Sequence, residues 1–268
     1  MEQRKRLTAS IYRNVLGFWL FHTTVFVCIA IIYHFQVYFL IAYLLSSVAI
    51  SLIMLGILMF ARHHFYLLET GVALDHVNVA NKLTLFRISS LPSILMLFIA
   101  SRTAPIAIIL IIYAGLAFIS DLLDGFVSRK THQTTRVGQY IDSMSDYAVL
   151  LGVAIAFASS GFISIWFFCL VLVRFISQWV SMGILFVMKR GTIEPRFSFL
   201  GKASVAVTMI AFAVDLLRLL SWFQPYLFLL FWIELLASAV LVISLVEKTL
   251  LFVGDLRSTI KQNSSLVQ

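Results

Sequence analysis

DLLDGFVSRKTHQTTRVGQYIDSMSD, residues 121–146, places four aspartates in a chain whose neighbouring segments are apolar. Asp121 and Asp124 are three residues apart, and Asp142 and Asp146 are four apart. Residues at these spacings share one face of a helix, so each pair projects two carboxylates in the same direction. Four carboxylates that converge inside a membrane require cations.

The composition around this stretch is that of a membrane protein. Hydrophobic residues make up 61% of the 268 residues and charged residues only 12%. Apolar runs repeatedly reach about twenty residues, the length that crosses a bilayer. We therefore expect an all-α integral membrane protein. Cys28 and Cys169 lie in separate apolar runs, which argues against a disulfide framework and a thiolate metal site.

The hydropathy pattern predicts eight membrane spans, and an even number returns both termini to the same side. The first apolar run is too long for a cleaved signal peptide and a second run follows at once, so we expect an anchor. The expected spans are residues 14–34, 36–60, 83–101, 104–120, 144–160, 162–188, 199–220 and 225–247.

The basic residues orient these spans. If the N-terminus is cytoplasmic, 16 of the 20 Lys and Arg residues fall in inner loops and tails, and only Arg102 and Arg218 fall outside. The positive-inside rule then places both termini and the aspartate cluster at the cytoplasmic face. This asymmetry explains the net charge of +8 without a nucleic-acid partner. The inner residues are Arg4, Lys5, Arg6, Arg13, Arg62, Lys82, Arg129, Lys130, Arg136, Lys189, Arg190, Arg196, Lys202, Lys248, Arg257 and Lys261.

Residues 61–82 interrupt the hydrophobic pattern with charged and histidine side chains. Their apolar positions Phe65, Leu68, Val72 and Val79 follow roughly one helical stripe, so we expect an amphipathic helix on the inner membrane surface. This segment divides the chain into four expected parts. They are an accessory pair of transmembrane helices (1–60), the juxtamembrane helix (61–82), a six-helix catalytic core (83–247) and a cytoplasmic tail (248–268).

The array Asp121-x2-Asp124-Gly125-x2-Ser128-Arg129-x8-Gly138-x3-Asp142-x3-Asp146 resembles the signature of the CDP-alcohol phosphotransferases. Members of this family transfer a phosphoalcohol group from a CDP-linked donor to a hydroxyl and release CMP. Ser128 stands where the family usually has alanine. The resemblance extends over residues 78–247, through the segment Asn81-Lys-Leu-Thr-Leu-Phe-Arg87 and through Gly201-Lys202-Ala-Ser204.

The proposed chemistry also follows from the residues. An alcohol that attacks a phosphorus surrounded by negative oxygens needs those oxygens neutralised and its own proton removed. Asp121, Asp124 and Asp142 offer hard oxygen ligands for Mg²⁺ or Mn²⁺, and two helices with a pair each would hold two ions about 4 Å apart. Asp146 is expected to be a further metal ligand and the catalytic base. The alternative is a set of structural ion pairs with Arg129, Lys130 and Arg136.

Two glycines expose backbone where a flat nucleotide could approach closely, namely Gly125 and Gly138. Helix packing is the alternative reading of both. No Gly-x4-Gly-Lys-Ser/Thr loop is present, which argues against ATP as donor. The resemblance implies a nucleotide site formed by Asp121, Gly125, Arg129, Gly138, Asn81 and Thr84.

Basic residues are expected to receive the acceptor alcohol. The candidates at or near the cytoplasmic ends of spans are Lys202, Arg129 and one or more of Arg174, Lys189, Arg190 and Arg196, and Arg87 is a further candidate. For Lys189 and Arg190 the alternative is ordinary membrane anchoring. Arg174 lies about midway along span 162–188, where a charge is costly without a partner. The 81–87 and 201–202 segments resemble phosphatidylglycerophosphate synthases, which use CDP-diacylglycerol and glycerol 3-phosphate. Ser143 and Tyr147 differ from the residues that this subgroup commonly has at these positions. Inositol phosphate and serine therefore remain alternative acceptors.

Other function classes fit less well. A transporter would also bury acids and Arg174, but it would show broken helices in two repeated halves, and the sequence has no such repeat. A non-catalytic relative would be expected to lose an aspartate or a glycine of the motif. The family resemblance also implies a homodimer.

Overall fold

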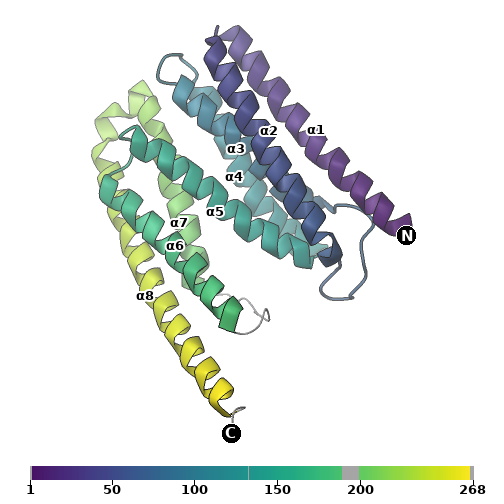
Figure 1. Ribbon diagram of the computed structural model, residues 1–268. Coiled ribbons are helices and arrows are strands. Elements are labelled where there is room, and N and C mark those ends of the chain that lie inside the picture. Colours follow the sequence, from purple (N-terminus) through teal and green to yellow (C-terminus); the bar gives the residue numbers. More distant parts are fainter. Residues whose placement is uncertain (1, 132, 189–198, 266–268) are drawn as a thin grey trace. The chain divides into compact units, whose positions relative to one another are not determined.

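The computed structural model describes residues 2–131, 133–188 and 199–265, and helices form its regular structure (Figure 1). No β-strand occurs among these residues, which contain only isolated β-bridges. The α-helices are α1 (Glu2–Ile32), α2 (Val37–Phe60), α3 (Val79–Ala100), α4 (Ala107–Lys130), α5 (Arg136–Ser159), α6 (Ile165–Met188), α7 (Phe199–Asp215) and α8 (Phe228–Ser265), and the 3-10 helices are η1 (Ala61–His64), η2 (Leu216–Leu219) and η3 (Ser221–Tyr226).

Seven helices of the described residues are long and apolar enough to cross a membrane. They correspond to α1 to α5, α7 and α8, while the described apolar part of α6, Ile165–Ser181, is shorter. The prediction of an all-α integral membrane protein is therefore confirmed.

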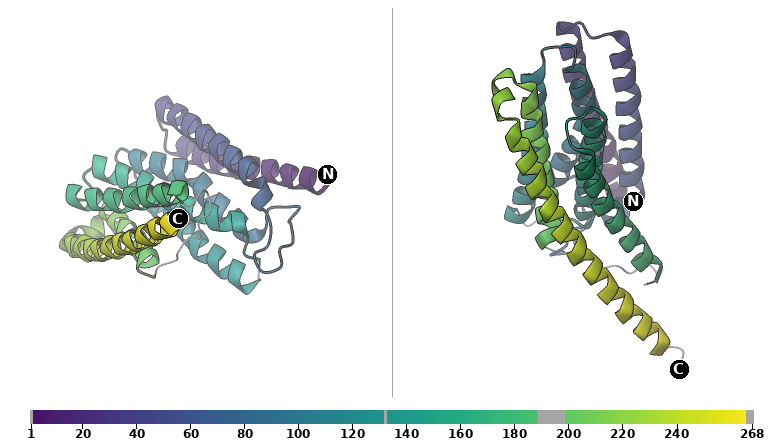
Figure 2. Two further views of the ribbon diagram at one scale, coloured as in Figure 1. Left: turned by 60° about the horizontal axis from the view of Figure 1, so that its bottom comes forward. Right: turned by 90° about the vertical axis from the view of Figure 1, so that its left-hand side faces the viewer.

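The chain forms two compact units, Met1–Gly152 and Val153–Gln268. In the first unit, α1 and α2 run side by side and both contact α3, which also packs on α4 (Figures 1 and 2). The spanning part of α3 is 67% buried, and small side chains line it, among them Ser89, Ser90 and Ser93. Small residues let neighbouring helix backbones approach closely within a membrane.

The predicted amphipathic helix over residues 61–82 is wrong, because only Ala61–His64 is helical there and α3 begins at Val79. Gly71 adopts a φ of +69°, and its amide donates to the Leu67 carbonyl at 2.9 Å in a tight turn. Antiparallel bridges join Tyr66 to Ala73 and Leu67 to Thr135. The segment thus satisfies its backbone through a hairpin-like loop.

An apolar cluster connects this loop to the helices of the first unit. Phe65 and Val77 are buried in it, with residues from α1, α2, α3 and α5. Two further contacts tie α1 to the loop, because the Val77 amide donates to Ser10 Oγ at 3.1 Å and Gln3 Nε2 donates to the Ala73 carbonyl at 2.9 Å. The cluster consists of Leu7, Ile11, Val15, Met54, Leu58, Phe65, Val77, Leu85, Val137 and Ile141.

In the second unit, α8 contacts both α6 and α7 (Figure 1). Phe212 of α7 makes edge contacts with Phe157 and Phe167, whose ring centroids lie 5.5 and 6.1 Å away. Glu234 of α8 accepts hydrogen bonds from the Ser164 hydroxyl and, at 3.3 Å, from the Ser164 amide. A carboxylate at this position satisfies an otherwise unpaired donor at the start of α6.

Candidate active site in the first unit

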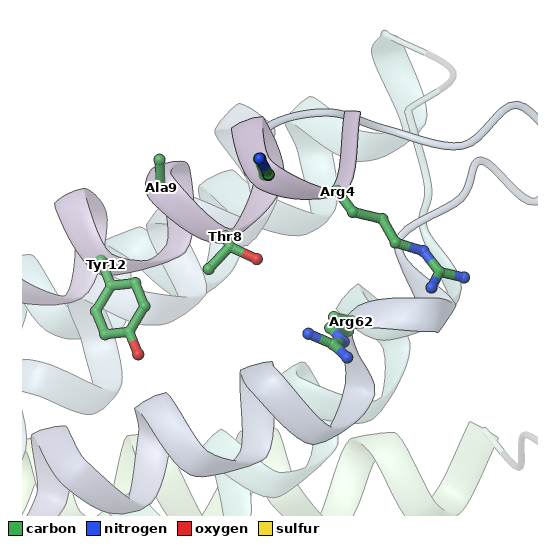
Figure 3. A pocket seen from close by; sticks show the side chains of 6 residues that line it. Arg4, Thr8, Ala9, Tyr12 and Arg62 are labelled. Carbon is green, nitrogen blue, oxygen red and sulfur yellow. The ribbon is translucent and has the colours of Figure 1, made fainter. Parts of the chain in front are cut away.

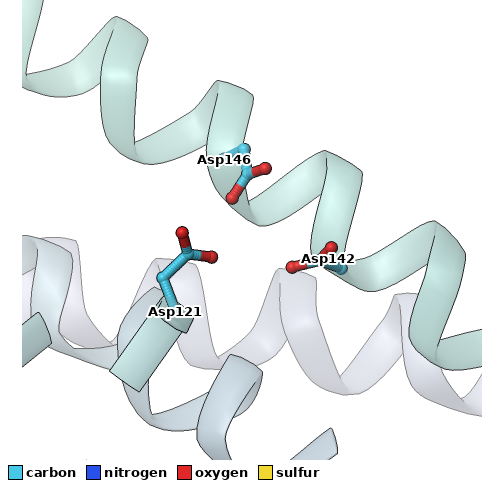
Figure 4. Close-up of side chains that lie close together, drawn as sticks. All are labelled: Asp121, Asp142 and Asp146. Atoms are coloured by element: carbon cyan, nitrogen blue, oxygen red, sulfur yellow. The ribbon is translucent and has the colours of Figure 1, made fainter. Parts of the chain in front are cut away.

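Three of the four predicted aspartates converge. Asp121 lies on α4, while Asp142 and Asp146 lie one turn apart on α5. One carboxylate oxygen from each lies within 4.8 Å of the other two, and Figure 4 shows the carboxylates of the two helices pointing toward one another. The spacing argument correctly placed Asp142 and Asp146 on one face, and the fold adds Asp121 from a second helix.

A buried arginine of α3 lies in the middle of this cluster. The Arg87 side chain is fully buried and forms ion pairs with all three carboxylates. Its Nη1 pairs with Asp121, and its Nη2 lies 3.0 Å from Asp142 Oδ1 and 2.8 Å from Asp146 Oδ1. Its Nε donates to Ser145 Oγ at 2.8 Å. Burial of a guanidinium at this depth is tolerable only because charged partners surround it.

Asp124 lies on the same helix as Asp121 but makes a different contact. Its side chain is 6% exposed, and its Oδ2 accepts a hydrogen bond from Thr84 Oγ1 of α3 at 2.9 Å. Asp124 therefore stands outside the three-carboxylate group in this structure. Thr84 and Arg87 are three residues apart on α3, so one face of that helix serves both aspartates of α4.

The charges and ligand atoms of this site fit a divalent cation. Among the described side chains, Arg87 forms ion pairs with three of these carboxylates and Asp124 bonds to the neutral Thr84, so one cation offsets one of four negative charges when all four are ionised. The buried Oδ1 of Asp146 makes no hydrogen bond despite its ion pair with Arg87. Carboxylate oxygens are the ligands that Mg²⁺ and Mn²⁺ prefer. The four aspartates thus form a suitable donor set.

A neutral network joins the beginning of α3 to the beginning of α5. Asn78 caps α3 by accepting from the Asn81 amide at 3.0 Å. The side chains of Asn81 and Thr135 bond to each other at 3.1 to 3.2 Å, and Thr135 Oγ1 also accepts from the Gly138 amide at 3.0 Å. A Cβ on Gly138 would lie 2.5 Å from Asn81 Oδ1. The glycine is therefore required for this close approach.

The other predicted site residues are distributed as follows. Gly125 is partly buried on α4, and its carbonyl accepts from Ser128 Oγ at 3.2 Å. The side chain of Arg129 lies outside the described residues. Arg174 and Lys202 belong to the second unit. Arg87, predicted to contact the acceptor, is held by aspartates in this structure.

The second unit contains a polar network of its own within its helices. Arg174 of α6 is buried, its Nε donates to Ser244 Oγ of α8 at 3.0 Å, and its Nη1 donates to Gln178 at 2.7 Å. Ser244 in turn donates to Ser204 Oγ of α7 at 3.3 Å. Arg174 thus links the three helices of this unit. Lys202 is exposed, two residues before Ser204 on α7.

Sequence reasoning missed several residues of the site. Ser145 and Thr135 have ordinary hydroxyls, and Asn78 lies before the family-like segment that begins at Asn81. For Thr135 and Asn78 a signal was present, since each lies just before the start of a helix, where such side chains cap free amides. Ser145 had no signal beyond its position between the two aspartates of α5.

Comparison with known proteins agrees with this geometry. The family model for CDP-alcohol phosphatidyltransferase matches residues 77–245, which include α3 to α7 and the carboxylate cluster. The chain therefore belongs to the CDP-alcohol phosphatidyltransferase family, and its activity is that of a membrane-embedded transferase. The match begins after α2, so α1 and α2 lie outside the part that defines the family.

Individual relatives share 28–29% of the aligned residues with this chain. A CDP-diacylglycerol–glycerol-3-phosphate 3-phosphatidyltransferase of Sodalis glossinidius is 29% identical over 152 residues, which cover 53% of this chain and 78% of the relative. The Escherichia coli protein of the same name is 28% identical over 158 residues, or 55% of this chain and 81% of the relative. A cardiolipin synthase (CMP-forming) of Streptomyces coelicolor is 28% identical over 155 residues, or 56% and 70%.

Proposed function

We propose that this protein transfers the phosphatidyl group of CDP-diacylglycerol to glycerol 3-phosphate and releases CMP. The observation that carries the proposal is the convergence of three carboxylates on Arg87, those of Asp121, Asp142 and Asp146. The fourth aspartate, Asp124, accepts a hydrogen bond from Thr84. The names of the Sodalis and Escherichia relatives support glycerol 3-phosphate as acceptor.

In this proposal Asp121, Asp124, Asp142 and Asp146 would hold Mg²⁺ or Mn²⁺, with two ions as the expected number. The metal would neutralise the negative oxygens of the donor pyrophosphate, including the charge that develops on them during transfer. Arg87 maintains the separation of the carboxylates, because its two terminal nitrogens span α4 and α5. Thr84 fixes the rotamer of Asp124 by a hydrogen bond.

Asp146 is the proposed base. Its carboxylate would accept the proton of the acceptor hydroxyl as the new O–P bond forms and the bond from phosphorus to the CMP oxygen breaks. CMP then leaves with the electron pair of that bond. The position of Asp146 supports this role, because its carboxylate lies in the same cluster as the proposed metal ligands Asp121 and Asp142.

The nucleotide is proposed to lie against the beginnings of α3 and α5 and the middle of the motif. Gly125 and Gly138 would expose backbone to it, and Asn81, Thr84, Asp121 and Arg129 would complete the contacts. The Asn81–Thr135 pair and the Gly138 amide hold this region in one conformation. These hydrogen bonds support a preformed nucleotide site, and a preformed site lowers the entropic cost of binding the flat cytosine ring.

Lys202 and Arg174 are the proposed ligands of the acceptor phosphate. Arg87 is not proposed for this role, because carboxylates and Ser145 occupy its guanidinium. The chemistry of a buried guanidinium supports this role for Arg174, because its planar, permanently charged group can donate two hydrogen bonds to one phosphate. Both termini and the active site are proposed to face the cytoplasm, where CMP and glycerol 3-phosphate are soluble. A homodimer is proposed from the family resemblance alone.

The names of the relatives also support a second candidate reaction. The Streptomyces relative is named a cardiolipin synthase (CMP-forming), so a lipid hydroxyl, as in phosphatidylglycerol, is an alternative acceptor. Purified protein in neutral nanodiscs with CDP-diacylglycerol should be offered glycerol 3-phosphate, phosphatidylglycerol, inositol phosphate and serine separately. We expect CMP release to depend on glycerol 3-phosphate. CMP release that depends on another acceptor would replace that assignment and leave the transferase class unchanged.

A further inference from the structure

A surface cavity of about 370 Å³, largely open to its surroundings, lies between the beginning of α1 and the end of α2 in the first unit. Its lining residues are Arg4, Lys5, Thr8, Ala9 and Tyr12 of α1 and Arg62 of η1, directly after α2. Figure 3 shows Thr8 and Tyr12 projecting from α1 toward the segment that carries Arg62. None of these six residues belongs to the carboxylate site or to the family match at 77–245.

The cavity has an uncompensated positive charge. Three of its six lining side chains are cationic and none is acidic. The neighbouring Arg6 is paired with Glu2 at 2.7 Å, whereas among the described residues no carboxylate forms a salt bridge with Arg4, Lys5 or Arg62. Two hydroxyls, from Thr8 and Tyr12, add hydrogen-bond donors. Such a set is suited to a phosphate group.

An apolar stripe continues from the cavity along α1. Tyr12, Leu16 and Leu20 follow one another at intervals of four residues, and their side chains are 50%, 55% and 49% exposed. Residues at this spacing lie on the same face of a helix, so the stripe extends directly from the cationic end. A ligand with a phosphate head and an acyl tail would contact both surfaces, whereas a free phosphate would contact only the first.

The cavity is long enough to span the headgroup region of the membrane interface. Arg4 and Tyr12 are eight residues apart on α1, which corresponds to about 12 Å along the helix. The polar headgroup region of one leaflet is about 5–8 Å thick, so with Tyr12 at the hydrocarbon border the cavity crosses this region and the backbone of Arg4 lies on its aqueous side. With the orientation proposed above, this is the cytoplasmic leaflet, whose surface is commonly anionic.

We propose that this cavity binds the headgroup of an anionic phospholipid, with one acyl chain along the Tyr12–Leu16–Leu20 stripe. The site gives the α1–α2 pair a function that the catalytic core does not supply, namely recognition of the anionic lipid that surrounds the enzyme. The proposal does not depend on the acceptor or on catalysis. Its failure is therefore distinguishable from failure of the proposed transferase reaction.

Native mass spectrometry of the full chain in neutral detergent tests the proposal, with equimolar phosphatidylglycerol and phosphatidylcholine of identical acyl chains as probes. Wild type should retain phosphatidylglycerol preferentially. The triple variant Arg4→Gln, Lys5→Gln, Arg62→Gln should lose at least about tenfold of that preference, since one basic residue near an anionic lipid is worth about fivefold. The triple variant Arg102→Gln, Lys130→Gln, Arg257→Gln removes equal charge from exposed positions outside the cavity and should retain it.

A second variant separates the cavity from general charge attraction. Ala9→Trp places a large side chain in the cavity and leaves every basic residue in place, so phosphatidylglycerol retention should fall. Equal losses in the two triple variants, or unchanged retention in Ala9→Trp, would overturn the proposal. Displacement of phosphatidylglycerol by millimolar inorganic phosphate would show that the cavity takes a free anion, which would also overturn the lipid assignment. A thermal unfolding curve of each variant identifies any loss caused by misfolding.

Discussion

At the scale of single residues, Arg87 explains how four aspartates coexist at one end of a membrane helix bundle. Its guanidinium bonds to carboxylates from two helices, and it leaves charge that a divalent ion would balance. The aspartates were predictable from their spacing because helix periodicity alone brings i and i+4 together. The partners of Arg87 were not, because Arg87 and Asp142 are 55 residues apart and only tertiary packing joins them.

The proposed role of Asp146 as the base can be distinguished from its role as a metal ligand. We expect Asp146→Asn to keep the affinity for CDP-diacylglycerol within a few-fold and to lower turnover by about 10² or more, the usual contribution of a positioned base. Single-turnover CMP release and donor binding, measured on the same preparation, give the two quantities. An Asn variant with near-normal turnover would exclude Asp146 as the base.

Gly138 gives a test of the neutral network. An added Cβ would lie 2.5 Å from Asn81 Oδ1 and 2.7 Å from Thr135 Oγ1, so Gly138→Ala must separate that side-chain pair. We expect a loss of about 1–3 kcal/mol in unfolding free energy, the typical cost of overpacking, and weaker donor binding. The matched control is Gly115→Ala on α4, where nothing lies within 4 Å. If both variants unfold at the wild-type temperature, the close approach is unimportant.

At the scale of elements, α1 and α2 pack on the catalytic helices and are not loosely attached. His22 of α1 contacts the Phe86 carbonyl of α3 through Nε2 at 3.2 Å, and its Nδ1 contacts the Tyr113 hydroxyl of α4. Because a carbonyl can only accept, Nε2 carries the proton and Tyr113 donates to Nδ1. Both contacts were unpredictable, since a lone histidine in an apolar run has no sequence signal for its partner.

His22→Ala should therefore weaken the first unit. It removes one hydrogen bond each from a buried hydroxyl and a buried carbonyl, at a cost of about 0.5–1.5 kcal/mol for each bond. Because Phe86 precedes Arg87, we also expect lower transferase activity at temperatures below unfolding. The control Thr24→Ala changes an exposed side chain of the same helix. Thermal unfolding and CMP release in nanodiscs measure the two effects, and wild-type values for His22→Ala would contradict this view of α1.

The loop before α3 shows where element prediction fails. The spacing of Phe65, Leu68 and Val72 fits a helical stripe, but Leu68 and Val72 are exposed and only Phe65 is buried. Gly71 provides a left-handed turn, and Thr135 supplies a partner for the extended backbone at Leu67. Tertiary pairing thus overrode a weak amphipathic pattern, whereas the long apolar spans left no alternative to helices.

At the scale of the whole molecule, the charge distribution predicts one orientation in the membrane. In a chain with Cys28→Ala and Cys169→Ala, a membrane-impermeant thiol reagent should label Thr131→Cys only from the cytoplasmic side. The same reagent should label Thr103→Cys only from the opposite side. Both residues are exposed, and the loops that carry them flank α4 at its two ends. Labelling of Thr131→Cys from outside would invert the proposed topology.

The central claim is that the carboxylate cluster catalyses metal-dependent release of CMP, and one assay tests it most directly. Purified protein in nanodiscs is given CDP-diacylglycerol and labelled glycerol 3-phosphate, with Mg²⁺, with excess EDTA, or with EDTA followed by excess Mg²⁺. We predict one labelled lipid for each CMP, no turnover in EDTA, recovery on metal addition, and no turnover in Asp142→Asn at any metal concentration. Undiminished CMP release in EDTA, or wild-type turnover by Asp142→Asn, would contradict the account.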